Sequence, residues 1–563
     1  MPPKTLLKLN SLREPGPDRH WIFRRPANTL CSPGHTPLLR SRPMFALLLG
    51  LVVGILTLGA APPIAHAEPA EYLPVRHAAY QELDALFAQG LVTSLAIHTR
   101  PLSRVDIARA LVLAARQNPA LESEIHFRRL ARELVRELRE IGWEPNAEET
   151  GPLIDTGTRD QRFRVSLAAH ALGDYDETRE DAHFRLRDES SLSGRFSLQL
   201  WPGLGVFEEI GITRIRGQRD YIDAIAANSD LEVALLRGEV TGRVGPVTGA
   251  IGYESHRWGP GRSGSLLLAD AAGPMTSLWF QGALRGRVAV TGTVLNAVVS
   301  NADGAYLGAH RLEFEIAPKL TIGVAEAVRY SGTGIDPLYA IGIIPYTLIE
   351  RIQVREASAD SLRPLERANV MASADVAWRA VPGLTLYGEF LVDDFGTESG
   401  DMPDRFGYQA GFRSERPLGA RHLHFLGEYT RVRNYTYSVD YGENFIYRER
   451  SLGYTLGPDV ENVTLEAWLD LARDWQLRWT GYFTNKGEGS LGQPWVAGQG
   501  GTSAGLSGVV EERREVWGDV RWLPRDNVDL SVGLGFRRIA NEQHVSGAER
   551  EAWLGRFAAE LRY

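Results

Sequence analysis

The sequence predicts an all-β transmembrane barrel of about 18 antiparallel strands, with a small N-terminal α-helical bundle domain in front of it. Two observations predict this fold. Apolar residues recur with the period of a helix up to about residue 143, and from about residue 160 the period becomes two and stays two to the last residue. No helical pattern accompanies these strands to cover an open sheet. Closure into a barrel then satisfies every backbone hydrogen bond.

The chain begins with the features of an export signal. Residues 45–61 are apolar, two arginines precede them, and the small-x-small pattern Ala65-His66-Ala67 follows, as a signal peptidase requires. We expect residues 1–67 to be a leader and signal peptide that is cleaved near Ala67, with Met44 as a candidate true start. A membrane anchor is the alternative, but about 17 apolar residues are at the short limit for a spanning helix.

Composition excludes several classes of function. Loss of residues 1–67 removes eight Lys and Arg but only two Asp and Glu, which takes the formal net charge from −8 to −14. Nucleic acid is therefore not an expected partner, because it requires a basic face. The only cysteine, Cys31, lies in the same segment, so the mature protein has no disulfide. No later run of about 18 apolar residues exists, which excludes membrane-spanning helices.

Residues 68–155 are predicted to form a periplasmic helical domain. Tyr80, Leu83 and Phe87 recur at helical spacing, and Ser103 with Asp106 three residues on has the form of a capping box. A further apolar stripe predicts another helix, and we interpret the charges on its other faces as a solvated surface. This stripe consists of Ile125, Leu130, Leu134, Leu138 and Ile141.

Residues 156–563 are predicted to form the barrel. Apolar and polar residues alternate, for example in 384–390, 475–483 and 528–537. The last strand ends on Tyr563 and resembles the signal read by the outer-membrane barrel-insertion machinery, which we expect as a partner together with lipid and lipopolysaccharide. Tryptophans near strand ends suit an interfacial girdle: Trp201, Trp378, Trp475, Trp522 and Trp553.

Charged residues alternate with the apolar ones and predict a wide, polar lumen. A lone Arg or Lys that faced lipid at the midplane would cost about 2–4 kcal/mol, so these side chains are expected to point inward. Their mixed signs predict pairing across the lumen. The set is Arg164, Glu389, Glu428, Arg478, Asp519, Arg521 and Arg537.

Two segments hold the candidate glycan-binding residues. Gly259-Pro260-Gly261 breaks a strand and places Arg257 and Trp258 at a turn or at a constriction of the lumen. The connection 433–457 is long for a hairpin and is rich in tyrosine. Sugars offer C–H faces to aromatic rings and hydroxyl groups to charged side chains. The alternative for each residue is a structural role in a packed turn or loop. The candidates are Arg257, Trp258, Tyr435, Tyr437, Tyr441, Tyr447 and Arg448.

The sequence predicts that the protein is not an enzyme. The segment 501–505 around Ser503 matches a nucleophile elbow formally, but that motif has meaning only at a strand-to-helix turn of an α/β sheet. Metalloprotease, phosphate-loop and dinucleotide signatures are absent, and the histidines show no ligand spacing. We therefore expect no catalytic residue, no cofactor and no metal.

The order of several motifs resembles the capsule assembly (Wzi-type) family of outer-membrane proteins. They include Arg257-Trp258-Gly259-Pro260-Gly261, Leu386-Tyr387-Gly388-Glu389-Phe390, Glu428-Tyr429-Thr430-Arg431-Val432 and Leu456-Gly457-Pro458-Asp459. The resemblance implies a barrel with a helical bundle at its periplasmic mouth. It also implies a lectin-like role in attaching capsular polysaccharide to the cell surface. Asp270-Ala271-Ala272-Gly273 replaces an Asn-rich stretch of the family, and Trp258 lacks a second tryptophan beside it, which indicates a divergent member.

We expect a monomer in the outer membrane of a Gram-negative bacterium. The sequence allows two classes of function. The first is binding or anchoring of capsular or other surface polysaccharide, which assists capsule assembly. It predicts that loop aromatics such as Tyr437 and Tyr447 face outward. The alternative is a general or substrate-selective outer-membrane porin, which rests on the polar lumen alone.

Overall fold

A computed structural model describes residues 71–562 with short gaps. The predicted leader, with Met44 and the cleavage site near Ala67, lies outside the described residues. The gaps are residues 94, 146–151, 159–160, 179–184, 187–189, 202, 215–222, 228–230, 285, 287, 301–303, 360–367, 395–402, 420, 440–442, 473, 497–504 and 526.

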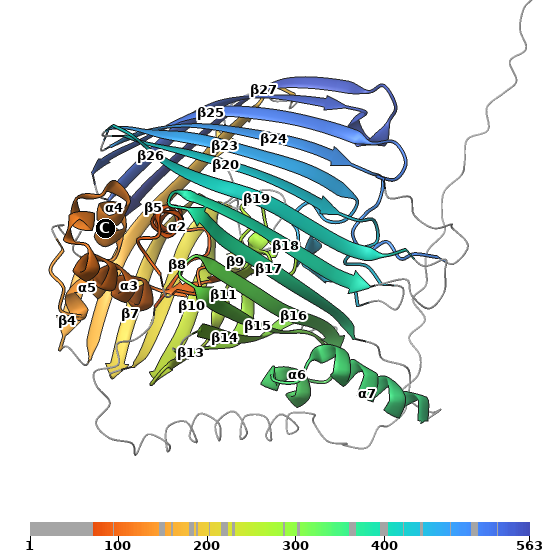
Figure 1. The fold of residues 1–563 in the computed structure, drawn as a ribbon, viewed down its shortest axis with the longest axis horizontal. Coiled ribbons are helices and arrows are strands. Elements are labelled where there is room, and N and C mark those ends of the chain that lie inside the picture. The colour runs from red at the N-terminus through yellow and green to blue at the C-terminus, as the bar shows by residue number, and fades with distance from the viewer. Residues whose placement is uncertain are drawn as a thin grey trace, which may run out of the picture. The chain divides into compact units, whose positions relative to one another are not determined.

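Eighteen long antiparallel strands in the described part of the chain close into one barrel (Figure 1), which confirms the predicted number. Each strand pairs with the long strands before and after it in the chain, and β27 pairs with β5 to close the ring. They are β5 (Arg162–Asp176), β7 (Ser191–Trp201), β8 (Leu204–Arg214), β10 (Leu231–Val244), β11 (Val247–Glu254), β13 (Met275–Leu284), β14 (Ala289–Ser300), β15 (Ala305–Ala317), β16 (Leu320–Ser331), β17 (Asn369–Val381), β18 (Leu384–Asp394), β19 (Arg405–Leu418), β20 (Arg421–Val432), β23 (Val460–Ala472), β24 (Trp475–Lys486), β25 (Glu511–Arg525), β26 (Val528–Ala540) and β27 (Glu549–Arg562). The short strands β4 (Ile154–Gly157), β6 (Arg185–Leu186) and β9 (Asp223–Ala227) pair beside them.

The two ends of the barrel differ in the length of their connections. At the short-turn end, two residues join β7 to β8, β17 to β18 and β25 to β26. The connections at the opposite end, the loop end, are longer, and one of them carries helices α6 (Pro337–Ile341) and α7 (Tyr346–Ala359). Bacterial outer-membrane barrels have the same asymmetry, with short turns on the periplasmic side.

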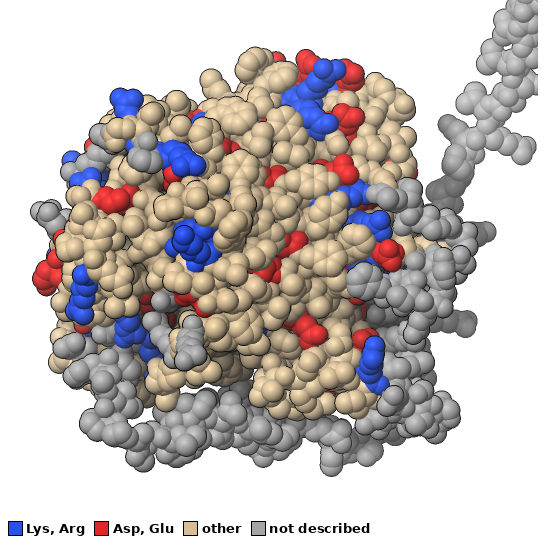
Figure 2. Space-filling model, in the orientation of Figure 1, with Lys and Arg blue, Asp and Glu red and all other residues tan. Residues whose placement is uncertain are grey.

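The wall of the barrel is apolar outside and polar inside. In β18, Leu386 and Phe390 are exposed, whereas Thr385, Tyr387 and Glu389 are buried, as the alternation predicts. Most of the wall in Figure 2 is free of charged side chains. None of the described helices is long and apolar enough to cross a membrane. Four of the exposed tryptophans lie beside the short-turn end, as in an interfacial girdle: Trp201, Trp378, Trp475 and Trp522. The predicted Trp553 is also exposed and lies near the loop end.

Within the described residues, four helices precede the barrel: α2 (Ala79–Gln89), α3 (Arg104–Gln117), α4 (Ile125–Glu133) and α5 (Val135–Glu140). Their buried leucines share one apolar cluster, and the Ser103 hydroxyl caps α3 by accepting a hydrogen bond from the backbone N–H of Asp106. The helices belong to the same compact unit as the barrel. A separate domain with the boundaries 68–155 therefore stays a prediction.

The helices are held at the short-turn end of the barrel (Figure 1). The Arg243 guanidinium on β10 lies 2.6 Å from the Asp106 carboxylate of α3. The backbone N–H of Gly383, in the turn between β17 and β18, donates to the carbonyl of Ala88 at 3.1 Å. Arg562, at the end of β27, pairs with Glu133 of α4. Helices and barrel are thus joined by contacts around much of the rim.

The outward face of β26 provides a test of the membrane-facing surface. Leu534 is 70% exposed at the middle of this strand. We expect Leu534→Arg to lower the free energy of unfolding in phospholipid vesicles by about 2–4 kcal/mol, because the charge would face hydrocarbon. Ser531 lies on the same strand but lines the interior. Ser531→Arg is therefore the matched control and should lower the free energy of unfolding less. Reversible urea unfolding measures both variants. If both lost the same unfolding free energy, the assignment of Leu534 to the lipid-facing side would be contradicted.

Candidate functional site: a polar cavity inside the barrel

Two connections at the loop end fold into the lumen. The β11–β13 segment comprises residues 255–274, and the β20–β23 segment comprises residues 433–459. Their apolar side chains and those of the adjacent barrel wall form one buried cluster, so this side of the lumen is closed and the predicted wide lumen is wrong there. The cluster includes Trp258, Leu266, Leu267, Leu268, Tyr437, Phe445, Tyr447, Leu452 and Tyr454.

Two buried acids of the wall hold the β11–β13 segment by its backbone. The Glu428 carboxylate accepts from the N–H groups of Arg262 at 2.6 Å and Ser263 at 2.9 Å. The Glu389 carboxylate accepts from the N–H of Leu266 at 3.0 Å. A carboxylate that receives two or more such bonds stabilises a buried turn whose donors would otherwise be unpaired. These two predicted inward charges therefore anchor a segment rather than line an open channel.

The Gly-Pro-Gly turn fits closely against the wall. A Cβ atom at Gly261 would lie 1.9 Å from the Gln409 side-chain oxygen and 2.3 Å from the carbonyl of Gly264. Only glycine can occupy this position without moving the segment.

Arg257 and Trp258 lie inside the lumen. The sequence predicts them either at a turn or at a constriction of the lumen. Both pair with residues 99 and 100, which precede α3. The Arg257 guanidinium donates to the carbonyl of Arg262 at 3.0 Å, and Trp258 is only 2% exposed. Arg257 thus closes its own turn and also lines a cavity in the lumen, whereas Trp258 offers no open ring face to a sugar.

The described tyrosines of the β20–β23 segment are buried, so the expectation that Tyr437 and Tyr447 face outward is wrong. The Tyr437 hydroxyl donates to the carbonyl of Leu266 at 2.6 Å and accepts from the N–H of Tyr454 at 3.1 Å. The Tyr447 hydroxyl donates to the carbonyl of Pro274 at 3.3 Å. The bonds to Leu266 and Pro274 join the two inserted segments, whereas the sequence predicts a loop exposed to water.

The remaining candidates also belong to this packed region or lie outside the described residues. Tyr435 is buried. Arg448 donates to the Tyr253 hydroxyl at 3.3 Å and lies over the Tyr447 ring. Tyr441 and Ser503 are not among the described residues.

A cavity of about 830 Å³ remains in the lumen along β23 to β27 and β5. It extends from Thr484 and Arg513 at the loop end to Asp529 and Glu560 at the short-turn end. Predicted inward residues line it, namely Arg478, Asp519 and Arg521.

Opposite charges pair within this cavity, as their mixed signs predict. The Glu466 carboxylate accepts from Arg262 at 3.3 Å and from Arg478 at 2.5 Å. The Asp519 carboxylate accepts from Arg556 at 2.6 Å, and the Arg556 guanidinium also lies 4.2 Å from the centre of the Trp517 ring. The wall therefore offers guanidinium, carboxylate and aromatic groups side by side.

The helical segment supplies the other face of the cavity. Tyr80, Asp84 and Arg100 line it, and the Arg100 guanidinium lies 2.6 Å from the Asp84 carboxylate. Burial by itself would raise the pKa of Asp84, but the charges of Arg100 and Arg413 outweigh it and lower the pKa to about 2. Asp84 is therefore ionised at neutral pH and adds a fixed negative charge to the cavity.

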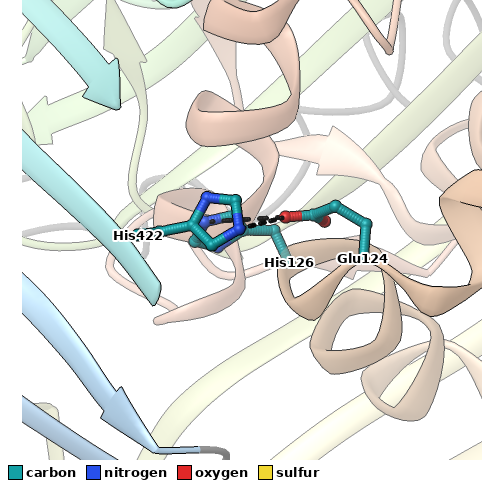
Figure 3. A group of neighbouring side chains, drawn as sticks. All are labelled: Glu124, His126 and His422. Carbon is teal, nitrogen blue, oxygen red and sulfur yellow. Dashed lines mark ion pairs between the residues drawn. The ribbon is translucent and has the colours of Figure 1, made fainter. Parts of the chain in front are cut away.

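Histidines from two distant parts of the sequence meet at the short-turn end. His126 comes from α4, and His422 and His424 come from β20. In Figure 3 the imidazoles of His126 and His422 are directed toward the Glu124 carboxylate. Sequence spacing could not reveal this group, although His422 and His424, two residues apart on one strand, share a face. The prediction that no metal site exists rested on that spacing alone.

Comparisons with known proteins agree on the fold. The family model described as capsule assembly protein Wzi matches residues 163–553. The structure of Wzi from Escherichia coli, an outer membrane protein involved in group 1 capsule assembly and described as a carbohydrate-binding β-barrel, has 16% identity and a TM-score of 0.59. The alignment covers 87% of this chain and 99% of that one.

Two Pseudomonas aeruginosa proteins match less well. OprD has 8% identity and OpdK 10%, each with a TM-score of 0.40 and 71% of this chain covered, and the alignments cover 95% and 98% of those chains. A comparison with curated protein sequences finds no match.

The contacts of Glu428 generate a prediction. Glu428→Ala removes the acceptor for the amides of Arg262 and Ser263, which should cost about 1–3 kcal/mol. We expect hydrogen exchange of these amides to become about 5- to 150-fold faster, measured by mass spectrometry of the detergent-solubilised protein. Glu515→Ala, which removes a cavity-lining acid that does not bind the segment, should leave their exchange unchanged. Unaltered exchange in Glu428→Ala would show that other contacts hold the segment.

Proposed function

Because this chain belongs to the Wzi capsule assembly family, we propose that it binds or anchors capsular or related polysaccharide at the surface of a Gram-negative bacterium, without catalysis. The observation that carries the proposal is the cavity of about 830 Å³ with its guanidinium, carboxylate and aromatic lining. The likeness to E. coli Wzi concerns the fold, so the ligand and its site are our own inference.

The chemistry of the cavity suits a glycan. Its volume is in the range of about 300–1,000 Å³ that is typical of ligand pockets. Arg478 and Glu466 offer donors and acceptors to sugar hydroxyl groups, and the Tyr482 ring offers a face to sugar C–H groups. Arg478, Arg513 and Arg556 could also pair with the carboxylates of acidic sugars.

The orientation of the barrel supports access from outside the cell. We propose that the short turns and the helical segment face the periplasm, because short turns do so in bacterial barrels. The cavity would then be reached from the loop end, where Thr484 and Arg513 line it. Export would use the predicted signal peptide in residues 1–67.

The porin alternative rests on a polar lumen, and two features speak against an open channel. The inserted segments pack into an apolar cluster, and the helices cover part of the short-turn end. We therefore propose a barrel that does not conduct ions steadily.

Binding tests the proposal directly. The purified protein in detergent should be retained by polysaccharide from the producing organism and not by an unrelated polysaccharide. Arg478→Ala should weaken retention about tenfold or more, because a hydrogen bond to a charged group contributes about 1.5–3 kcal/mol. Arg538→Ala is the matched control, since Arg538 is half exposed and pairs with Glu549 on the neighbouring strand. Absence of selective retention by the unmodified protein would refute the proposal.

Conductance tests the alternative. We expect planar bilayers with the unmodified protein to stay silent, and a variant in which a short Gly-Ser linker replaces residues 259–272 to open steady channels. Steady conductance of the unmodified protein would favour the porin.

A further inference from the structure

A buried group of metal-ligating side chains joins the helical segment to the barrel wall. It consists of His126 on α4, Glu415 on β19 and His424 on β20, and one ligand atom from each lies within 4.8 Å of the others. All three side chains are more than nine-tenths buried, with exposures of 2%, 6% and 0%. The group does not line the proposed glycan cavity.

Each histidine has one nitrogen held by a carboxylate. His126 Nδ1 lies 2.6 Å from Glu82, and His424 Nε2 lies 3.1 Å from Asp470. The Arg129 guanidinium bridges these two carboxylates, at 2.8 Å from Asp470 and 3.6 Å from Glu82. Carboxylates that hold the far nitrogen of a histidine are the usual outer neighbours of a metal-binding imidazole.

The opposite nitrogens point into the group. His126 Nε2, His424 Nδ1 and the Glu415 carboxylate oxygen Oε2 are all buried. The last two atoms contact each other as an ion pair, whereas His126 Nε2 has no hydrogen-bond partner. Buried polar atoms without partners are costly, and each requires an explanation such as a bound ion. A single cation among these three atoms would give His126 Nε2 a partner and would bind His424 Nδ1 and Glu415 Oε2 in place of their contact with each other.

The charges nearby favour a cation as well. Glu82, Glu124, Glu415 and Asp470 provide four carboxylates, and Arg129 provides one positive charge. A metal binds neutral imidazoles and therefore displaces their extra protons. In that state this set has three surplus negative charges in a buried place. A dication reduces the surplus to one, which lowers the cost of burying these groups.

We propose that His126 Nε2, His424 Nδ1 and the Glu415 carboxylate bind a divalent transition metal of the zinc class, which fastens α4 to β19 and β20. Two imidazoles and one carboxylate are ligands that zinc accepts, whereas calcium and magnesium prefer oxygen ligands alone. Tetrahedral ligands at zinc lie about 3.4 Å apart, which small side-chain rotations can reach from the present spacing.

A fourth ligand is within reach on the same side. Glu124 Oε1 lies 3.9 Å from His126 Nε2 and 4.0 Å from His422 Nε2. The ring of His424 is stacked on Trp468 at 4.6 Å, which fixes its plane. The site would then be a closed structural one that locks the helical segment onto the rim.

The experiment uses the full-length mature protein without a histidine tag. The protein is treated with chelator, dialysed against zinc and freed of excess metal, and its zinc content is measured by plasma mass spectrometry. We expect one zinc per chain, a higher melting temperature with zinc than without, and loss of both in His126→Ala and His424→Ala. His544→Ala, a histidine in a loop at the far end, should keep full zinc content.

A change in the outer carboxylates separates a metal site from a packing defect. Glu82→Gln keeps the size of the side chain and should weaken zinc affinity about 10- to 100-fold, while heat-modifiable gel mobility shows that the barrel is folded. Folded unmodified protein without zinc would overturn the proposal. Full zinc content in His424→Ala with loss in His422→Ala would overturn the assigned ligands, and preference for calcium or magnesium would overturn the metal class.

Discussion

Pairing of the last strand with the first is the contact on which the rest of this structure depends. Residues 554–562 of β27 pair with residues 168–176 of β5, so neither strand has a free edge. An unpaired backbone group in hydrocarbon costs several kcal/mol, and a closed antiparallel ladder removes that cost. Because the strands follow one another in chain order, closure also brings Arg562 to the helices at the N-terminal end of the described chain.

A closed wall with an apolar outside must place its polar residues in the lumen, and the two sides of the lumen satisfy them differently. Beside β18 and β20, Glu389 and Glu428 bind the backbone of the β11–β13 segment. Beside β23 to β27, arginines and acids pair with one another and leave a cavity. The inserted segments thus form one boundary of the cavity, and the cavity is the part of the lumen that a ligand could enter.

Much of the fold could be predicted because the membrane imposes a strict rule. Lipid on one side and a polar lumen on the other require apolar and polar residues to alternate along each strand, as Leu386 and Glu389 show. The number of strands and the inward charges could be predicted from this alternation. The helices were also visible, since Ser103 caps the apolar run that follows it.

The candidate site could be predicted only in part. Alternation along the strands places Arg478, Asp519 and Arg521 in the lumen, but which segments fill the rest of the lumen depends on contacts between distant residues. A tyrosine-rich polar loop has the same composition whether it meets sugar in water or packs into a lumen. The acceptor of the Tyr437 hydroxyl is the carbonyl of Leu266, on another inserted segment. His126 and His424 are about 300 residues apart and meet only because α4 lies at the rim next to β20. The cavity itself depends on which segments enter the barrel, and no local pattern specifies that.

The central claim is that a surface glycan enters the cavity beside the C-terminal strands. The most direct measurement is an experimental structure of the protein with an oligosaccharide fragment of the polysaccharide from its own organism. The account predicts sugar density in the lumen, in contact with Arg478 and Tyr482. Density confined to the outer loops, with the luminal cavity unchanged, would contradict it.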